Sequence, residues 1–166
     1  MEMTESAEVL YRPATADDIP LIVQVAREMW DMGAAKAMEQ RHGLIAGRPW
    51  QEHVADSMLS AMEARVSQGS CIVAEVNGYL AGWASWSFDE ERSIGTVGYN
   101  GVHPQFRGHG IGTELVRRAV EALREGGMRI AAVTTGLNEG HAAARAVYEK
   151  LGFKPLVQSV HYTMEL

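Results

Sequence analysis

The stretch RGHGIGTELVRRAVEALREGG, residues 107–127, decides how this sequence of 166 residues is organised. It opens with three glycines at alternate positions and continues as an amphipathic segment that Gly126-Gly127 ends. The apolar residues of that segment recur at the spacing of one helix face: Leu115, Val116, Ala119, Val120 and Leu123. Glycines before a helix either form a flexible turn or let a large ligand approach the backbone.

Two phosphate-binding loops fail to match these glycines. A Walker A loop needs Lys-Ser or Lys-Thr after its last glycine, and neither follows here. A dinucleotide fingerprint read from Gly108 has Thr113 in place of its third glycine, and Ala131–Val133 stand where an acidic residue is needed. The pattern R-x-x-G-x-G remains. Read this way, the helix start offers unpaired N–H groups and positive charge to a pyrophosphate, with Arg107 and Arg117 nearby.

Other segments predict a strand-helix-helix-strand-strand-strand-helix-strand-helix-strand order. Residues 9–14 form a first strand, Asp17 caps a helix with Pro20 in its first turn, and a second helix starts near Pro49. Asn77-Gly78 between two apolar runs predicts a two-residue hairpin, and a third strand follows it. The last three predicted elements are a strand over 129–137, a helix over 141–153 and an alternating strand over 157–166; residues 31–48 receive no assignment.

Composition predicts one soluble domain over residues 1–166. Hydrophobic residues make up 46% and charged residues 22%, and no apolar run reaches the roughly 18 residues of a membrane span. The acidic, polar start is unlike a signal peptide, and the single cysteine, Cys71, sits in an apolar run, so we expect a cytoplasmic protein. The net charge of −6 argues against nucleic-acid binding, and six scattered histidines lack metal-ligand spacing, so we expect no metal.

In this context, VHPQFRGHGIGTELVRRAVEALREGGMRI, residues 102–130, resembles the signature of the GNAT superfamily of N-acetyltransferases. The segment AAARAVYEKLGF resembles the family's Ala-x-x-x-Tyr-x-x-x-Gly-Phe ending, and the element order matches from Val9 to Leu166. The resemblance implies an α/β (α+β) fold with a mixed, mostly antiparallel sheet of about six to seven strands and helices on both faces. It also implies acetyl-CoA as co-substrate.

The resemblance assigns the acetyl-CoA contacts as well. In the family the fourth strand bulges and splays from the fifth, and residues 99–102 stand where the bulge would fall. Backbone groups of Gly101 and Val102 would bond the pantetheine arm, and the Val102 N–H would polarise the thioester carbonyl. The pyrophosphate would lie against Arg107 and the N–H groups of Gly108, His109, Gly110, Ile111, Gly112 and Thr113.

Tyr148 matches the family tyrosine that protonates the leaving thiolate; the alternative is a tyrosine that only packs in the core. His141 stands where the family often has an asparagine that contacts the cofactor arm. Asn138, three residues earlier, is the other candidate for that contact.

The general base is not identified by the resemblance. Thr96 stands where relatives often carry a glutamate, and threonine cannot act as a base near neutral pH. Asp89, Glu90 and Glu91 at the predicted hairpin tip remain candidates, acting directly or through water, and an ammonium acceptor could also lose its proton to water.

The leading hypothesis is an N-acetyltransferase in which a primary amine attacks acetyl-CoA directly in a ternary complex, because no Cys or Ser nucleophile is positioned by the pattern. A non-catalytic acyl-CoA-binding sensor and a transferase of a longer acyl group are the alternatives.

The acceptor, a small-molecule or peptide amine, is not identified, and the alternating last strand could support a homodimer. Acceptor contacts are expected from the first two helices and the outer strands, where Trp30 and Trp50 fall. Trp83 and Trp86, three apart on one strand, should face opposite sides.

Overall fold

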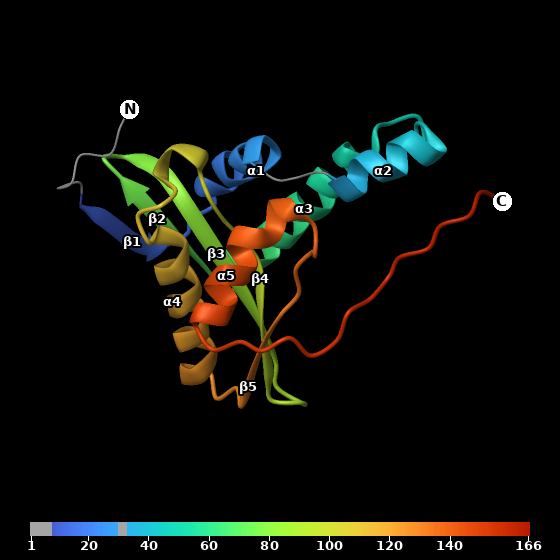
Figure 1. Cartoon of the computed structure of the whole chain (residues 1–166). Helices are drawn as coiled ribbons and strands as arrows, with labels where there is room; N and C mark the ends of the chain where they lie inside the picture. The colour runs from blue at the N-terminus through green and yellow to red at the C-terminus, as the bar shows by residue number, and fades with distance from the viewer. Residues whose placement is uncertain (1–7, 30–32) are drawn as a thin grey trace.

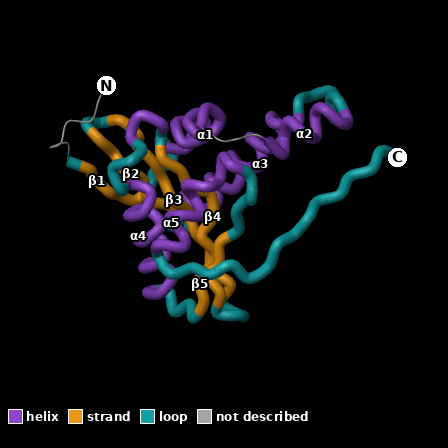
Figure 2. The backbone as a smooth tube through the Cα atoms, in the orientation of Figure 1, coloured by secondary structure: helices purple, strands orange, loops and turns teal. Residues whose placement is uncertain are grey.

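The computed structural model describes residues 8–29 and 33–166, and its centre is a five-stranded sheet in the order β1-β2-β3-β4-β5 (Figure 1). Helices cover both faces of this sheet (Figure 2). The strands are β1 (Val9–Pro13), β2 (Cys71–Val76), β3 (Tyr79–Asp89), β4 (Ile94–Val102) and β5 (Ile130–Val133). The helices are α1 (Asp18–Met29), α2 (Gly33–His42), α3 (Trp50–Ser67), α4 (Ile111–Glu125) and α5 (Ala142–Lys150), with short 3-10 helices η1 (Pro104–Phe106) and η2 (Glu139–His141).

Sheet topology confirms the predicted mixed α/β architecture. Strands β1 to β4 pair antiparallel, and β4 pairs parallel with β5 across the α4 crossover. The hairpin between β2 and β3 turns at Asn77 and Gly78, whose φ angles are 50° and 80°. A two-residue type I′ hairpin turn needs positive φ angles at both residues, and both have them. The predicted hairpin at Asn77-Gly78 is therefore confirmed.

Two hydrophobic cores lie on the two faces of the sheet. The first packs α4 and α5 against one face, and Trp86 belongs to it. The second packs α1 and α3 against the other face around the fully buried Trp83. The expected opposite orientation of the two tryptophans is confirmed, and both serve packing.

Several expectations differ from the structure. The sheet has five strands, fewer than the six to seven expected, because residues 154–166 form no strand and are exposed along their whole length. The segment that received no assignment contains α2, whose composition, GAAKAMEQRH, gives only a weak apolar face. Within residues 8–29 and 33–166, no helix combines the length and apolar character that a membrane crossing needs.

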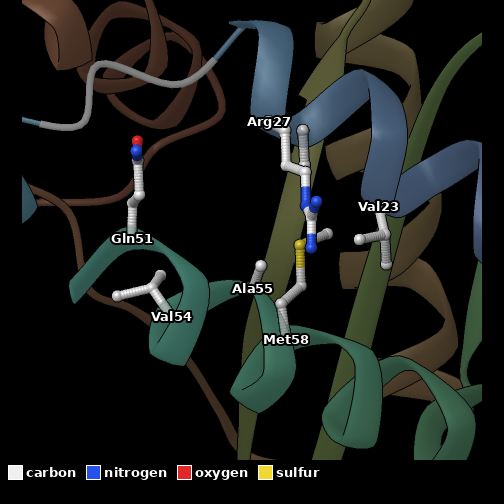
Figure 3. Close-up of a pocket in the computed structure, with 7 residues that line it drawn as sticks. Val23, Arg27, Gln51, Val54, Ala55 and Met58 are labelled. Carbon is white, nitrogen blue, oxygen red and sulfur yellow. The ribbon is translucent and has the colours of Figure 1, made fainter. Parts of the chain in front are cut away.

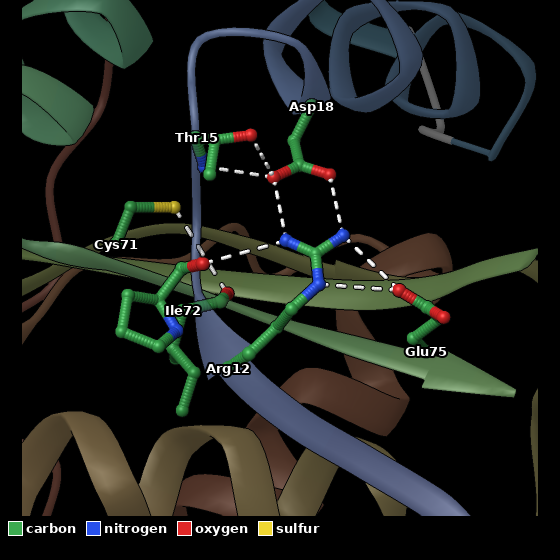
Figure 4. Close-up of polar contacts among 7 residues, drawn as sticks. Arg12, Thr15, Asp18, Cys71, Ile72 and Glu75 are labelled. Atoms are coloured by element: carbon green, nitrogen blue, oxygen red, sulfur yellow. Dashed lines mark hydrogen bonds and ion pairs between the residues drawn. The ribbon is translucent and has the colours of Figure 1, made fainter. Parts of the chain in front are cut away.

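Helix α1 begins at Asp18, directly after Asp17, the residue predicted to cap it, and the Asp18 side chain holds this start against the sheet. The Asp18 carboxylate accepts hydrogen bonds from the backbone N–H of Thr15 at 2.7 Å and from its hydroxyl at 3.0 Å. It also accepts two from the Arg12 guanidinium, at 2.8 and 2.9 Å, and Arg12 donates a further one to Glu75 at 3.1 Å (Figure 4). This network joins β1, β2 and the N-terminus of α1. Arg12 holds the pKa of Asp18 below its ordinary value.

Candidate functional site

Strands β4 and β5 part halfway along β4. Their parallel pairing runs from Ile94 and Ile130 to Val97 and Val133 and then stops, while β4 continues to Val102. The second half of β4 therefore has a backbone edge without a strand partner on its β5 side. This is the splay that the resemblance implies, and it opens a gap in the sheet.

A β-bulge stands at the point where the strands part. Ala84 of β3 lies opposite Asn100 and Trp86 lies opposite Val97, so two residues of β4, Gly98 and Tyr99, face the single Ser85. A side chain at Gly98 would come within 2.9 Å of the Ser85 hydroxyl, which donates a hydrogen bond to the Tyr99 carbonyl at 3.0 Å. The bulge was expected over residues 99–102; it begins one residue earlier because only glycine fits beside Ser85.

The N-terminus of α4 faces this region with bare backbone. Gly108 and Gly110 have φ angles of 83° and 78°, and a Cβ built on either would meet no atom within 4 Å. Gly110 is the N-cap and no side chain caps the helix. The first intrahelical bond runs from the N–H of Glu114 to Gly110, so the preceding N–H groups of the first turn have no partner inside the helix. Space and unpaired donors suited to an anion therefore occur together here.

Gly112 holds this helix start against the end of β4. A Cβ at Gly112 would come within 3.2 Å of a methyl group of Val102. The lack of a side chain thus lets the first turn of α4 approach the strand edge closely. As a result, the first turn of α4 lies directly beside the end of β4.

Arg107 supplies the positive charge beside the glycines. It is exposed, and its Nε donates to the Val102 carbonyl at 3.3 Å; among the described residues no carboxylate pairs with it. The charge expected from Arg117 is instead offset, since Arg117 and Arg118 both bind Glu114 at 2.8 and 2.7 Å. Those two arginines lower the pKa of Glu114 to about 2. His109 lies exposed between the glycines.

Tyr148 of α5 reaches across to β4. Its ring is buried, with 6% of the residue exposed, and packs edge-on against Phe153. The Nδ2 of Asn100 donates a hydrogen bond to the Tyr148 oxygen at 3.0 Å and another to the Gly98 carbonyl at 2.9 Å. Burial raises the pKa of Tyr148, and the Asn100 hydrogen bond lowers it by less. The phenol therefore stays protonated at neutral pH, at the edge of the parted strands.

Asn100 is a site residue that the sequence reasoning missed. Asparagine is depleted in strands, so its presence near the end of β4 is the signal that could have drawn attention to it. It joins the bulge to the tyrosine, because its amide contacts both Gly98 and Tyr148.

Asn138 and His141 lie together in the loop after β5. The Nδ1 of His141 is 2.8 Å from the Asn138 side-chain oxygen, and Arg145 donates to the carbonyls of Gly136 and Asn138 at 2.8 and 3.0 Å. The structure thus builds an ordered loop beside the α5 N-terminus. The predicted contact of either residue with a cofactor arm stays a prediction.

The three candidate bases lie at the other end of β4. Asp89 ends β3, pairs with Arg92 at 2.6 Å and is followed by the exposed Glu90 and Glu91 of the turn. Asn100 lies six residues beyond Ile94, which is roughly 20 Å at about 3.3 Å per residue. This separation argues against direct proton transfer from these carboxylates to a reaction beside Tyr148.

The region expected to bind the acceptor is only partly described. Trp30 lies outside the described residues, and Trp50 begins α3 with its ring 5.5 Å from that of His53. A pocket between α1 and α3 is lined by Val23, Arg27 and Met58, among others (Figure 3). Its cavity volume is about 10 Å³, enough for one water, so it is not an acceptor site.

The remaining reactive group of the chain is buried. Cys71 is 2% exposed and burial raises the pKa of its thiol to about 12, so it is not a nucleophile at neutral pH. Among the described residues, no three His, Cys, Asp or Glu side chains gather as a metal site would require.

A sheet that opens beside an uncapped, glycine-lined helix, with a protonated tyrosine at the opening, is the arrangement that the resemblance to the acetyltransferases implies. The model of the acetyltransferase (GNAT) family matches residues 35–153, and the chain belongs to this family. The resemblance seen in the glycine and tyrosine motifs is thereby confirmed.

Curated relatives carry the same assignment. An acetyltransferase of Pectobacterium atrosepticum is 32% identical over 126 residues, which cover 75% of this chain and 82% of that protein. The L-amino acid N-acyltransferase MnaT of Escherichia coli is 32% identical over 105 residues, which cover 60% of this chain and 59% of the enzyme. An uncharacterized N-acetyltransferase of Methanocaldococcus jannaschii also matches, but this chain covers only 38% of that protein's length.

Among solved structures, yncA of Salmonella typhimurium, a putative acetyltransferase with its cofactor acetyl-CoA, has a TM-score of 0.62 and 25% identity. The similarity covers 90% of this chain and 82% of that one. This similarity shows that the likeness extends beyond the motifs to the whole fold. The bound acetyl-CoA belongs to the S. typhimurium structure.

Proposed function

We propose that this protein transfers an acetyl group from acetyl-CoA to a primary amine by direct attack in a ternary complex. The observation that carries the proposal is the buried, protonated Tyr148, held by Asn100 at the opening between β4 and β5. The burial of Cys71 supports direct attack, because the lone thiol is unable to carry the acetyl group. We further propose that residues 1–166 act as one such domain, in the cytoplasm and without a metal.

Acetyl-CoA supplies an acetyl group activated as a thioester, and the residues of this chain fit its parts. The positive φ angles of Gly108 and Gly110 leave open space over the α4 amides for the diphosphate, and Arg107 faces it as a cation. The free edge at Gly101 and Val102 can bond the pantetheine amides as a neighbouring strand would. The Val102 N–H can donate to the carbonyl oxygen as negative charge develops there.

The chemical step forms one bond and breaks one. The amine lone pair attacks the thioester carbonyl carbon, the carbon–sulfur bond breaks, and the thiolate takes the proton of the Tyr148 hydroxyl. The nitrogen releases one proton to water, and the Tyr148 phenolate regains one from water, so the enzyme returns to its starting state. Asn100 acts as a positioning residue, because its N–H occupies a lone pair of the phenol oxygen and leaves the O–H to point elsewhere. The Tyr148 hydroxyl could instead donate to the Asn100 side-chain oxygen, but at 3.4 Å that hydrogen bond is weak.

The amine must lose a proton before or after attack, and water is the proposed acceptor. The carboxylates of Asp89, Glu90 and Glu91 are at the far end of β4, and Thr96, exposed on the same strand, is no base. An exposed amine equilibrates with solvent, so a fraction of neutral amine is available at mildly alkaline pH.

A small-molecule amine is the proposed acceptor, with a peptide amine as the second candidate. The E. coli relative is named an L-amino acid N-acyltransferase, and that likeness supports an amino acid or a similarly small amine. The net charge of −6 favours a cationic over an anionic acceptor.

The test is release of free thiol from acetyl-CoA with a panel of amino acids, polyamines and peptides. Tyr148→Phe should lower kcat by about 100-fold or more, the usual contribution of a general acid, while acetyl-CoA still binds. The matched control is Tyr79→Phe, since Tyr79 is 59% exposed at the start of β3. Tight acetyl-CoA binding with no thiol release for any amine would identify a sensor module instead. Transfer of only longer acyl groups would assign a different donor.

A further inference from the structure

The connection between β4 and Gly108, residues 103–107, is held together by His103. Its backbone N–H donates to the Ala81 carbonyl at 2.9 Å, which continues the pairing with β3 past the end of β4. Its carbonyl accepts a hydrogen bond from the N–H of Phe106 at 2.9 Å. Its Nδ1 accepts one from the N–H of Gln105 at 3.2 Å, so the side chain caps η1. One residue therefore fixes both the end of the strand and the start of the turn that follows.

The turn that His103 caps also sets the position of Arg107. Phe106 is 3% exposed and packs in the core against α4, and its ring centroid is 5.7 Å from that of His103. Arg107 follows directly, with its N–H 3.4 Å from the Pro104 carbonyl and its Nε 3.3 Å from the Val102 carbonyl. Loss of the cap on η1 would therefore loosen Arg107 and the amides that come after it.

The cap depends on the protonation state of the imidazole. A ring nitrogen accepts a hydrogen bond only while it carries no proton, so the bond from Gln105 requires neutral His103 with its hydrogen on Nε2. An imidazolium donates from both nitrogens, and its Nδ1–H would face the N–H of Gln105. Histidine is the side chain that ordinarily changes charge between pH 5 and 8, whereas the usual capping residues asparagine and serine do not. Histidine at this position therefore makes the cap sensitive to acid.

The charges around η1 offer no compensation to a protonated His103. Within residues 8–29 and 33–166, no carboxylate forms an ion pair with it, and the charged group on its own segment is the cation Arg107. The carboxylates of β2, of β3, which packs on η1, and of the first turn of α4 are each bound by an arginine: Glu75, Asp89 and Glu114. Protonation thus breaks one hydrogen bond and forms no ion pair in return.

We propose that neutral His103 is a positioning residue for the amides of residues 108–113, and that its protonation weakens the binding of coenzyme A. His103 acts through η1 and Arg107 and touches no part of the coenzyme. Apparent affinity falls with the fraction of molecules in which the binding conformation is formed, and the cap on η1 raises that fraction. The inference rests on the proposed function, because it needs the diphosphate to bind at the start of α4.

Calorimetric titration of coenzyme A tests the proposal with two variants, at about pH 8 and about pH 5.5, near the limits of the range in which histidine changes charge. His103→Asn keeps an acceptor for the Gln105 N–H but does not titrate, whereas His103→Phe keeps a ring beside Phe106 and loses the acceptor. At the higher pH the wild type and His103→Asn should bind alike, and His103→Phe about fivefold more weakly. At the lower pH the wild type should bind about fivefold more weakly than His103→Asn. The exposed His109 and the phosphates of the coenzyme titrate in both proteins, so this comparison removes their effects.

Equal loss of affinity on acidification in the wild type and His103→Asn would overturn the proposal, as would a His103→Phe that binds as tightly as the wild type at the higher pH. The amide resonance of Gln105 in the free protein gives a readout that needs no coenzyme. It should move with pH in the wild type and much less in His103→Asn; equal movement would show that His103 does not cap η1. A wild type that binds no coenzyme A at either pH would instead contradict the proposed function, and with it the role of His103 in binding. Thermal melts verify that both variants are folded.

Discussion

The phenol of Tyr148 keeps its proton because the surrounding core disfavours a buried phenolate. Asn100 opposes this partly, since its N–H bond stabilises the ionised oxygen and lowers the pKa. The tyrosine could be assigned from its motif in the sequence. Its partner could not, because the bulge at Gly98 and Tyr99 determines which way Asn100 faces and depends on contact with Ser85, a residue of the neighbouring strand.

Asn100→Ala should therefore change the pH dependence of the reaction and not only its rate. Losing the hydrogen bond raises the pKa of Tyr148, so the alkaline limb of the kcat profile should move to higher pH while kcat falls about tenfold. Thr96→Ala, an exposed change on the same strand, serves as control. An unshifted alkaline limb would show that Asn100 supports the fold without acting on Tyr148.

Among the elements, those specified by local chemistry were predictable. The hairpin at Asn77-Gly78 and the α4 stop at Gly126-Gly127 depend on neighbouring residues, and both occur as expected. Helix α1 begins directly after Asp17, with Pro20 in its first turn, as predicted. The hydrogen bonds of Asp18 could not be predicted, because its partner Arg12 arrives from β1. Helix α2 lacks a strong apolar face, so periodicity did not reveal it.

Asp18→Asn should destabilise the protein by about 2 kcal/mol in urea unfolding. The substitution removes the buried charge that pairs with Arg12, which destabilises the folded state. The Arg12 side chain is 34% exposed and can still be hydrated, which limits the loss of stability. Asp17→Asn, exposed beside it, should have little effect.

The same carboxylate gives stability a pH dependence. The pKa of Asp18 is lower in the folded state than its ordinary 3.8, so its contribution is present above that value and is lost as pH falls through the folded pKa. The acid-side loss of unfolding free energy should thus be smaller in Asp18→Asn than in the wild type. Equal losses would show that other carboxylates dominate acid unfolding.

At the scale of the whole molecule, the sequence indicated the family and the layered architecture but not the extent of the sheet. Alternation over residues 157–166 predicted a strand, whereas among the described residues this segment pairs with no other strand. A strand forms only where a neighbouring edge receives it, and alternation in the sequence does not say where that edge lies. The residues of the motifs, by contrast, come together in the structure because most of them lie on one helix start and one strand edge, and their binding roles stay predictions.

The most direct measurement of the central claim is calorimetric titration of coenzyme A into Gly110→Ala and Gly127→Ala. The two glycines have φ angles of 78° and 79°, and neither has an atom within 4 Å of a new Cβ, so both variants carry the same backbone strain. Only Gly110 lies over the amides that are proposed to bind the diphosphate; Gly127 lies just past the other end of α4. Gly110→Ala should weaken binding about tenfold or more, a loss of about 1.4 kcal/mol, while Gly127→Ala binds as the wild type does. Equal affinities in the two variants would contradict a diphosphate site at the start of α4.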